Sequence, residues 1–124
     1  MHEMSLTRNV LDIVLDEANA AGATRVQAVR VTIGDLRDIV EELFEGLFSH
    51  LARGTIAEGA ELEIVRIPVT VRCRKCSRVY HLDVRNKDTF ECPSCGLLDY
   101  GLNSGMEFFV SGIDILKGQP NSLR

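Results

Sequence analysis

The first twenty residues repeat apolar side chains at spacings of three and four, which is the period of an amphipathic helix. Ser5 is the expected N-cap of this helix, and Gly22 is its expected stop. The chain therefore predicts a first helix whose buried stripe consists of Leu6, Val10, Leu11, Ile13, Val14, Ala18 and Ala21.

The next pattern is the alternation of a strand with one buried face. Apolar residues alternate with polar ones until Gly34-Asp35 ends the run. We expect this strand to bury Val29, Val31 and Ile33.

A helical pattern returns between Asp38 and Arg53, and Gly54 is placed to close it in the left-handed conformation that glycine adopts readily. The predicted second helix has its own apolar stripe. Its members are Ile39, Leu43, Phe44, Leu47, Phe48 and Leu51.

Residues Glu61 to Arg72 are typical of another strand, but the apolar phase slips part-way along it. A bulge or bend near Val65-Arg66 would absorb this slip, because one extra residue reverses which face each side chain takes. Pro68 cannot donate a hydrogen bond to a neighbouring strand, so we expect it at a sheet edge. The two phases are represented by Leu62 and Ile64, then by Ile67, Val69 and Val71.

A last strand is predicted from Met106 to Leu116, with Phe109, Ile113 and Ile115 on one face. The order of elements predicts an α+β fold with two helices packed on a three-stranded sheet. The cysteine-rich stretch is then an insertion before the last strand. Residues 119–124 are expected to form a flexible tail.

The chain has 124 residues, of which 45% are hydrophobic, so one domain can bury roughly two thirds of its unfolded surface. No apolar run reaches the roughly 20 residues that span a bilayer, and no basic segment leads into an apolar signal stretch. We expect a cytoplasmic protein. In a reducing cytosol, closely paired thiols favour metal binding over disulfides.

The four cysteines form two C-x-x-C pairs separated by fifteen residues, which is the two-knuckle spacing of structural zinc sites. We predict one closed zinc site formed by Cys73, Cys76, Cys92 and Cys95. Two disulfides are disfavoured by the compartment, and a thioredoxin-like redox pair by the lack of a flanking βαβ pattern. An iron-sulfur cluster is not excluded by the spacing. Because thiolates fill all four positions, the predicted role is structural.

The net charge of −4 and a pI near 5.3 argue against a general nucleic-acid binder, which needs a clustered basic surface. Residues 72–104 nevertheless carry six basic and four acidic side chains. Arg74, Lys75 and Arg78 are placed either to offset the negative charge of a zinc-thiolate site or simply to lie in solvent. The sequence lacks a histidine-carboxylate cluster of the kind that holds an open catalytic metal, so we do not expect an enzyme.

The first residues, Met1-His2-Glu3, place an imidazole beside an α-amino group. After deprotonation, the amine, the His2 amide and the His2 ring form fused chelate rings around one metal. Such a planar set of nitrogen donors suits Ni(II) or Cu(II) better than zinc. The alternative is that His2 is an ordinary terminal residue.

This terminus, followed by a helix and a late four-cysteine module, resembles the HypA (HypA/HybF) family of hydrogenase nickel-insertion proteins. The resemblance also rests on three further segments spread over most of the chain. These are Val31-Thr32-Ile33-Gly34-Asp35-Leu36, Gly59-Ala60-Glu61-Leu62-Glu63-Ile64 and Gly105-Met106-Glu107-Phe108.

The resemblance implies a nickel metallochaperone that serves maturation of nickel-iron hydrogenase. It implies nickel ligands from Met1, His2 and Glu3, a nickel-binding α/β domain over residues 1–72 plus 105–118, and a zinc-ribbon domain over residues 73–104. The implied partners are a HypB-type GTPase and the hydrogenase large subunit. We expect neither nucleic acid nor a membrane as a partner, and a homodimer is possible. The alternative from the cysteines alone is a zinc-ribbon module that binds proteins or nucleic acid.

Two departures from the family pattern concern the sites. The spacer between the cysteine pairs is a few residues longer than the family leads us to expect. At the start of the second helix, where family members often carry an acidic residue, this chain has Val40, flanked by Asp38 and Glu41.

Overall fold

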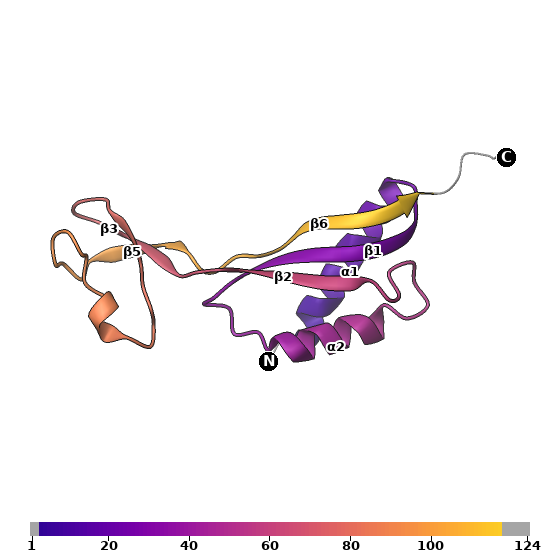
Figure 1. Cartoon of the computed structure of the whole chain (residues 1–124), viewed down its shortest axis with the longest axis horizontal. Helices are drawn as coiled ribbons and strands as arrows, with labels where there is room; N and C mark the ends of the chain where they lie inside the picture. Colours follow the sequence, from indigo (N-terminus) through magenta and orange to yellow (C-terminus); the bar gives the residue numbers. More distant parts are fainter. Residues whose placement is uncertain (1–2, 118–124) are drawn as a thin grey trace. The chain divides into compact units, whose positions relative to one another are not determined.

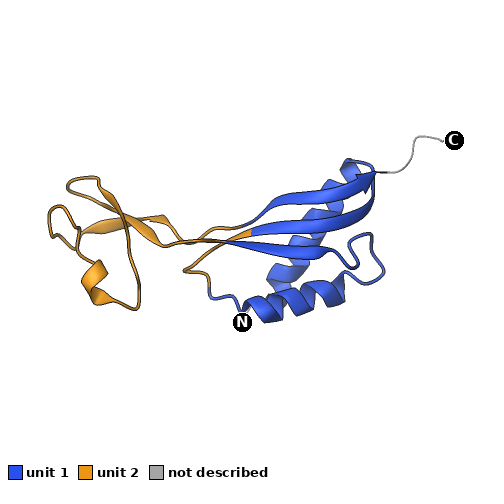
Figure 2. Cartoon of the chain, in the orientation of Figure 1, with its two compact units in different colours: residues 1–31, 38–65, 109–124 blue, residues 32–37, 66–108 orange. Residues whose placement is uncertain are grey.

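The structure is a computed structural model that describes residues 3–117, and it divides into two compact units (Figure 2). Unit 1 comprises residues 1–31, 38–65 and 109–124. Unit 2 comprises residues 32–37 and 66–108. The chain therefore passes between the units several times, and each unit is assembled from separate segments.

Unit 1 contains both α-helices, α1 (Glu3–Ala20) and α2 (Glu41–Leu51), and most of a three-stranded sheet. Both helices lie on the same face of this sheet (Figure 1). The strand order is β2-β1-β6, formed by β2 (Glu61–Ile67), β1 (Ala23–Gly34) and β6 (Phe108–Lys117). The predicted α+β class, with two helices on three strands and an insertion before the last strand, is confirmed.

The core of unit 1 lies where the helices meet the sheet. Val14 of α1 and Phe44 of α2 are fully buried, as are Val29 and Val31 of β1. Each such side chain contributes about 1.5–3 kcal/mol of hydrophobic stabilisation. Both predicted apolar stripes include a residue that is exposed. Ile13 of α1 and Leu43 of α2 are each 47% exposed.

The predicted helix starts are wrong by a few residues. Ser5 is not the N-cap of α1, because the helix already begins at Glu3. Helix α2 begins at Glu41 instead of near Asp38, with Val40 as its N-cap. The predicted stops are better, since Gly22 and Gly54 both adopt positive φ, of 74° and 77°.

The expected single strand from Glu61 to Arg72 is two strands, β2 and β3 (Thr70–Cys73), which belong to different sheets. The break falls at Pro68, which has no N–H with which to continue the ladder. The apolar phase slip therefore coincides with a change of core, since the two units divide between Val65 and Arg66.

The predicted buried face of β6 is wrong at one position. Ile113 and Ile115 are half-buried, but Phe109 is 51% exposed. Phe108 and Val110, on the opposite face, are the half-buried residues at that end of the strand. Burial changes face along β6, so strict alternation cannot assign it.

Unit 2 is built on a second three-stranded sheet, in which β3 lies between β4 (Val79–His81) and β5 (Tyr100–Ser104). Both pairings are antiparallel, and the register shifts between Thr70 and Val71 of β3. A short 3-10 helix, η1 (Lys87–Thr89), follows β4. The core is small, comprising Val69, Val71, Cys73, Tyr80, Leu82 and Cys92, with Phe90 and Tyr100 packed against it.

Two of the segments that carry the family resemblance meet in unit 2. Gly34 donates its N–H to the carbonyl of Glu107 at 2.7 Å, and Leu36 donates to the carbonyl of Gly105 at 2.8 Å. A Cβ on Gly34 would lie 2.1 Å from the backbone of Gly105. Only glycine therefore allows the two segments to approach this closely.

Within residues 3–117, no helix is both long and apolar enough to cross a membrane.

We expect Gly34→Ala to destabilise the protein by about 2–3 kcal/mol, because the added methyl group would displace backbone and not a mobile side chain. The matched control is Gly46→Ala in α2, where a Cβ would meet nothing within 4 Å. That change should stabilise by about 0.5–1 kcal/mol through helix propensity. Denaturant unfolding of both variants measures the difference, and equal effects would contradict the close approach.

Candidate metal centres

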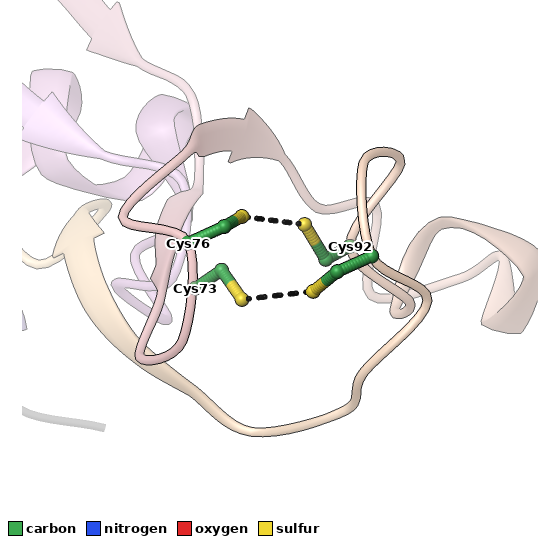
Figure 3. A group of neighbouring side chains, drawn as sticks. Cys73, Cys76 and Cys92 are labelled. Atoms are coloured by element: carbon green, nitrogen blue, oxygen red, sulfur yellow. Dashed lines mark hydrogen bonds between the residues drawn. The ribbon is translucent and has the colours of Figure 1, made fainter.

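The structure brings all four cysteine sulfurs together in unit 2, with every sulfur within 4.8 Å of the others. Cys73 and Cys95 have their Sγ atoms 3.5 Å apart, and those of Cys76 and Cys92 are 3.4 Å apart (Figure 3). These separations are too long for disulfides, which need about 2.05 Å. They are close to the roughly 3.8 Å between sulfurs around a tetrahedral zinc ion with Zn–S bonds of about 2.3 Å.

Two equivalent turns hold the sulfurs in place. In the first, the carbonyl of Cys73 accepts from Ser77 and the N–H of Cys73 donates to Arg78. In the second, the same two hydrogen bonds join Cys92 to Gly96 and to Leu97. Because the chain folds back in the same way at both C-x-x-C pairs, each pair directs its two sulfurs toward one point.

Each turn needs a residue in the left-handed conformation after its second cysteine. Gly96 supplies it in the second turn with a φ of 73°. Ser77 supplies it in the first turn with a φ of 65°, at a cost of about 1 kcal/mol or more for a residue with a Cβ.

The first cysteine of each pair ionises more easily than the second. Burial raises the pKa of Cys92, but the N–H groups of Cys95 and Ser94 outweigh it and lower the pKa to about 6. The N–H groups of Cys76 and Lys75 lower the pKa of Cys73. These turns thus use backbone amides to stabilise thiolates, which are the form that binds a metal.

The second cysteine of each pair has a raised pKa. For Cys95 the N–H of Leu97 favours the thiolate, but neighbouring Cys73 and burial oppose it and raise the pKa to about 11. The pKa of Cys76 is also raised, against the N–H of Arg78, by Cys92 and by burial. A metal that binds all four sulfurs must therefore displace protons, so its affinity falls as the pH falls.

The basic residues near the site have defined partners. Arg78 donates to the Ser94 hydroxyl at 2.8 Å and so joins the two turns. Arg74 forms an ion pair with Asp99 at 3.0 Å, which reduces its power to offset the charge of a metal site. His81 is exposed and lies outside the four-sulfur group.

The donor set fits a closed zinc site. Four sulfurs converge at tetrahedral spacing, two of them buried and two exposed, and they leave no position for a catalytic water. Bound zinc would hold the two turns and the short strands of unit 2 together.

The predicted nickel ligands are only partly within the described residues. Met1 and His2 lie outside them. Glu3 is the first residue of α1 and is 6% exposed, and its Oε2 accepts the N–H of Val40 at 3.3 Å. Its own backbone N–H and that of Val40 lower the pKa of the Glu3 carboxyl group.

Sequence reasoning did not find the residues that surround Glu3. Thr7 is fully buried and donates its hydroxyl to the Glu3 carbonyl. A threonine four residues after Glu3 is the only local signal of this contact. The Val40 contact has no sequence signal, because it joins positions 37 residues apart.

Comparison with known proteins decides the family. The sequence matches a family model described as "Hydrogenase/urease nickel incorporation, metallochaperone, hypA" over residues 1–115. This chain belongs to the HypA family. It is 36% identical to the hydrogenase maturation factor HypA of Thermococcus kodakarensis, with 94% of this chain and 97% of that protein covered. It is 35% identical to HypA of Lawsonia intracellularis, with 93% and 99% covered.

Two solved HypA structures have the same fold. The nickel metallochaperone HypA from Helicobacter pylori matches with a TM-score of 0.67 and 24% identity, covering 95% of this chain and all of that one. A second HypA solution structure gives a TM-score of 0.74 at 24% identity, covering 95% of this chain and 98% of that one. The family model describes HypA as a metallochaperone family, and the two structural matches show that this chain has the fold of the solved HypA structures.

We expect zinc removal to unfold unit 2, since its small core cannot hold the two turns together alone. Treatment with a chelator, or Cys92→Ser, should abolish zinc content and collapse the NMR dispersion of unit 2 amides. Leu98→Ala, at a 63% exposed position between Cys95 and Asp99, should change neither. A Cys92→Ser protein that kept zinc and dispersion would refute this role.

Substituting the residue with positive φ in each turn tests whether the two turns are equivalent. Ser77→Gly should stabilise the zinc-loaded protein by about 1 kcal/mol, because glycine adopts positive φ without a Cβ penalty. Gly96→Ala should destabilise it by a similar amount, since a Cβ there would meet nothing within 4 Å and only the backbone cost remains. Denaturant midpoints measure both changes, and shifts of the same sign would contradict the prediction.

Proposed function

We propose that this chain binds Ni(II) at its N-terminus and passes it on for maturation of nickel-iron hydrogenase. The observation that carries this proposal is the HypA match, which spans residues 1–115 and so includes the terminal segment. The nickel ligands would be the amine of Met1, the amide and ring of His2, and the amide or carboxylate of Glu3. The ion is cargo, and no catalytic step is assigned to the protein.

The local structure of α1 supports this ligand set. The first four N–H groups of an α-helix have no acceptor within the helix. Since α1 begins at Glu3, the amide of Glu3 can bind a metal without breaking a helical hydrogen bond. An amide nitrogen in such a chelate must lose its proton, and a protonated His2 cannot bind. Nickel affinity is therefore expected to fall as the pH falls.

We assign the two proposed metal sites to two domains. Residues 1–72 plus 105–118 would form the nickel-binding domain, and residues 73–104 the zinc-ribbon domain that presents a surface to a partner. The proposed partners are a HypB-type GTPase and the hydrogenase large subunit, in the cytoplasm. Because the family description names urease as well, a urease could also receive the metal.

Loss of the terminal chelate tests the function directly. His2→Ala, or a short extension before Met1, should abolish nickel binding in a calorimetric titration, while one zinc ion per chain remains. His50→Ala is the matched control, because His50 is exposed at the end of α2 and should leave both metals unchanged. Unchanged nickel titrations in the two terminal variants would sink the proposal.

A further inference from the structure

The unit 2 sheet has an outer face, which points away from its small core, and this face carries two arginines. Cys73 of β3 is 1% exposed and belongs to the core, so its neighbour Arg72 lies on the opposite face of the strand. Arg72 is paired directly with Gly101 of the adjacent strand β5 (Figure 1). A Cβ on Gly101 would lie 3.4 Å from the Nη2 of Arg74. Both arginines therefore lie on the face that Gly101 leaves bare.

An open hollow of about 470 Å³ lies over this part of the sheet. Its volume is within the range of ligand sites, which is about 300–1,000 Å³. Arg72, Arg74, Ser77, Gly101 and Asn103 are among its lining residues, and none of the lining residues is acidic. Gly101 keeps the hollow open, because a large side chain there would have to displace the Arg74 guanidinium.

Both guanidinium groups keep N–H donors that no group within residues 3–117 accepts. Arg72 donates from Nη1 to the carbonyl of Ser77 at 3.0 Å, and Arg74 pairs its Nε with Asp99 at 3.0 Å. Arginine has five N–H donors in a planar fork, so each group can still bind a carboxylate through two parallel hydrogen bonds. The side chains of Arg74 and Asp99 are 63% and 69% exposed, and an ion pair so exposed does not exclude a second carboxylate.

The charge of the chain favours an acidic ligand at this place. Unit 2 has eight basic and six acidic residues, whereas unit 1 has six basic and twelve acidic ones. An acidic partner is therefore attracted to unit 2 and repelled by unit 1. A zinc ion bound by four thiolates would be formally negative, but Lys75 and Arg78 lie in the first cysteine turn and offset that charge.

We propose that this hollow binds the carboxylate side chains of an acidic protein segment and is the surface by which unit 2 holds a partner. Arg72 and Arg74 are two residues apart, which in an extended chain is about 6.6 Å, so they match carboxylates at alternate positions of an extended segment. Nucleic acid is a poorer fit, because the lining has no aromatic ring on which a base could stack. The partner contact named here extends the proposed function of the zinc ribbon and involves no nickel.

Titration of the full-length, zinc-loaded protein with a capped peptide of alternating serine and glutamate tests this site. We expect the amide NMR signals of Gly101 and Asn103 to shift, and the affinity to fall as salt is added. The same peptide with glutamine in place of glutamate should leave both signals unchanged. Equal shifts with the two peptides would overturn the inference.

Substitutions locate the binding. Arg72→Gln with Arg74→Gln should weaken peptide binding by about tenfold, because both charged forks are lost. The matched control is Arg85→Gln with Lys87→Gln, which removes the same charge from unit 2 outside the hollow. It should change the affinity by less than about twofold, because distant exposed charges are screened. Gly101→Ile fills the hollow without changing the charge and should weaken binding as much as the loss of both arginines.

Each variant is assayed with its zinc content and NMR dispersion measured. Equal losses of affinity in the two double variants would show diffuse charge attraction and overturn the inference. Unchanged binding by a zinc-loaded Gly101→Ile protein would do the same, because the peptide would then lie elsewhere.

Two further probes distinguish the source of the anion. At equal concentration and salt, inorganic phosphate and a short single-stranded oligonucleotide should each shift Gly101 and Asn103 less than the glutamate peptide does. Tighter binding of either one, lost in the double arginine variant, would identify a phosphate or nucleic-acid site and refute an acidic protein partner. None of these titrations contains nickel. If they fail while His2→Ala still abolishes nickel binding, the proposed nickel function stands and only the docking site is wrong.

Discussion

The convergence of four cysteine sulfurs is the constraint on which unit 2 depends. Its core contains six buried residues, and two of them, Cys73 and Cys92, are themselves proposed metal ligands. Structural zinc in small modules contributes about 10–16 kcal/mol of apparent folding free energy, which is comparable with what the four other buried side chains supply at about 1.5–3 kcal/mol each. The amides that lower the pKa of Cys73 and Cys92 prepare half of the ligands before the metal arrives.

Much of the fold could be predicted because its signals are local. The alternation around Val31 and the 3.6-residue period around Val14 placed their elements correctly, although Thr32, on the face of β1 expected to be exposed, is buried as well. The equal C-x-x-C spacing likewise predicted that the sulfurs converge, since each pair builds the same turn. The predicted strand was wrong where one continuous stretch packs into two different cores, as it does on either side of Pro68.

Contacts between distant residues were beyond local rules. The sequence suggested that Val40 leaves the start of the second helix without an acidic side chain, because the family pattern often has one there. The structure shows that a carboxylate does reach the start of α2, but it comes from Glu3 at the start of the other helix, α1. The close approach of Gly34 to Gly105 is likewise visible only once the two segments are side by side. A single sequence records which residues are unusual, but not which of them meet.

The composition of unit 2 from two stretches of chain limits how the protein can be divided. Residues 66–108 include all four cysteines, but three backbone hydrogen bonds tie them to residues 32–37. These bonds run from Gly34, Asp35 and Leu36 to Glu107, Ile67 and Gly105. A gene fragment that encodes only the cysteine-rich stretch would lack its bonding partner. Grafting this module onto another scaffold would therefore require the short N-terminal piece to be carried along as a second, non-contiguous insert.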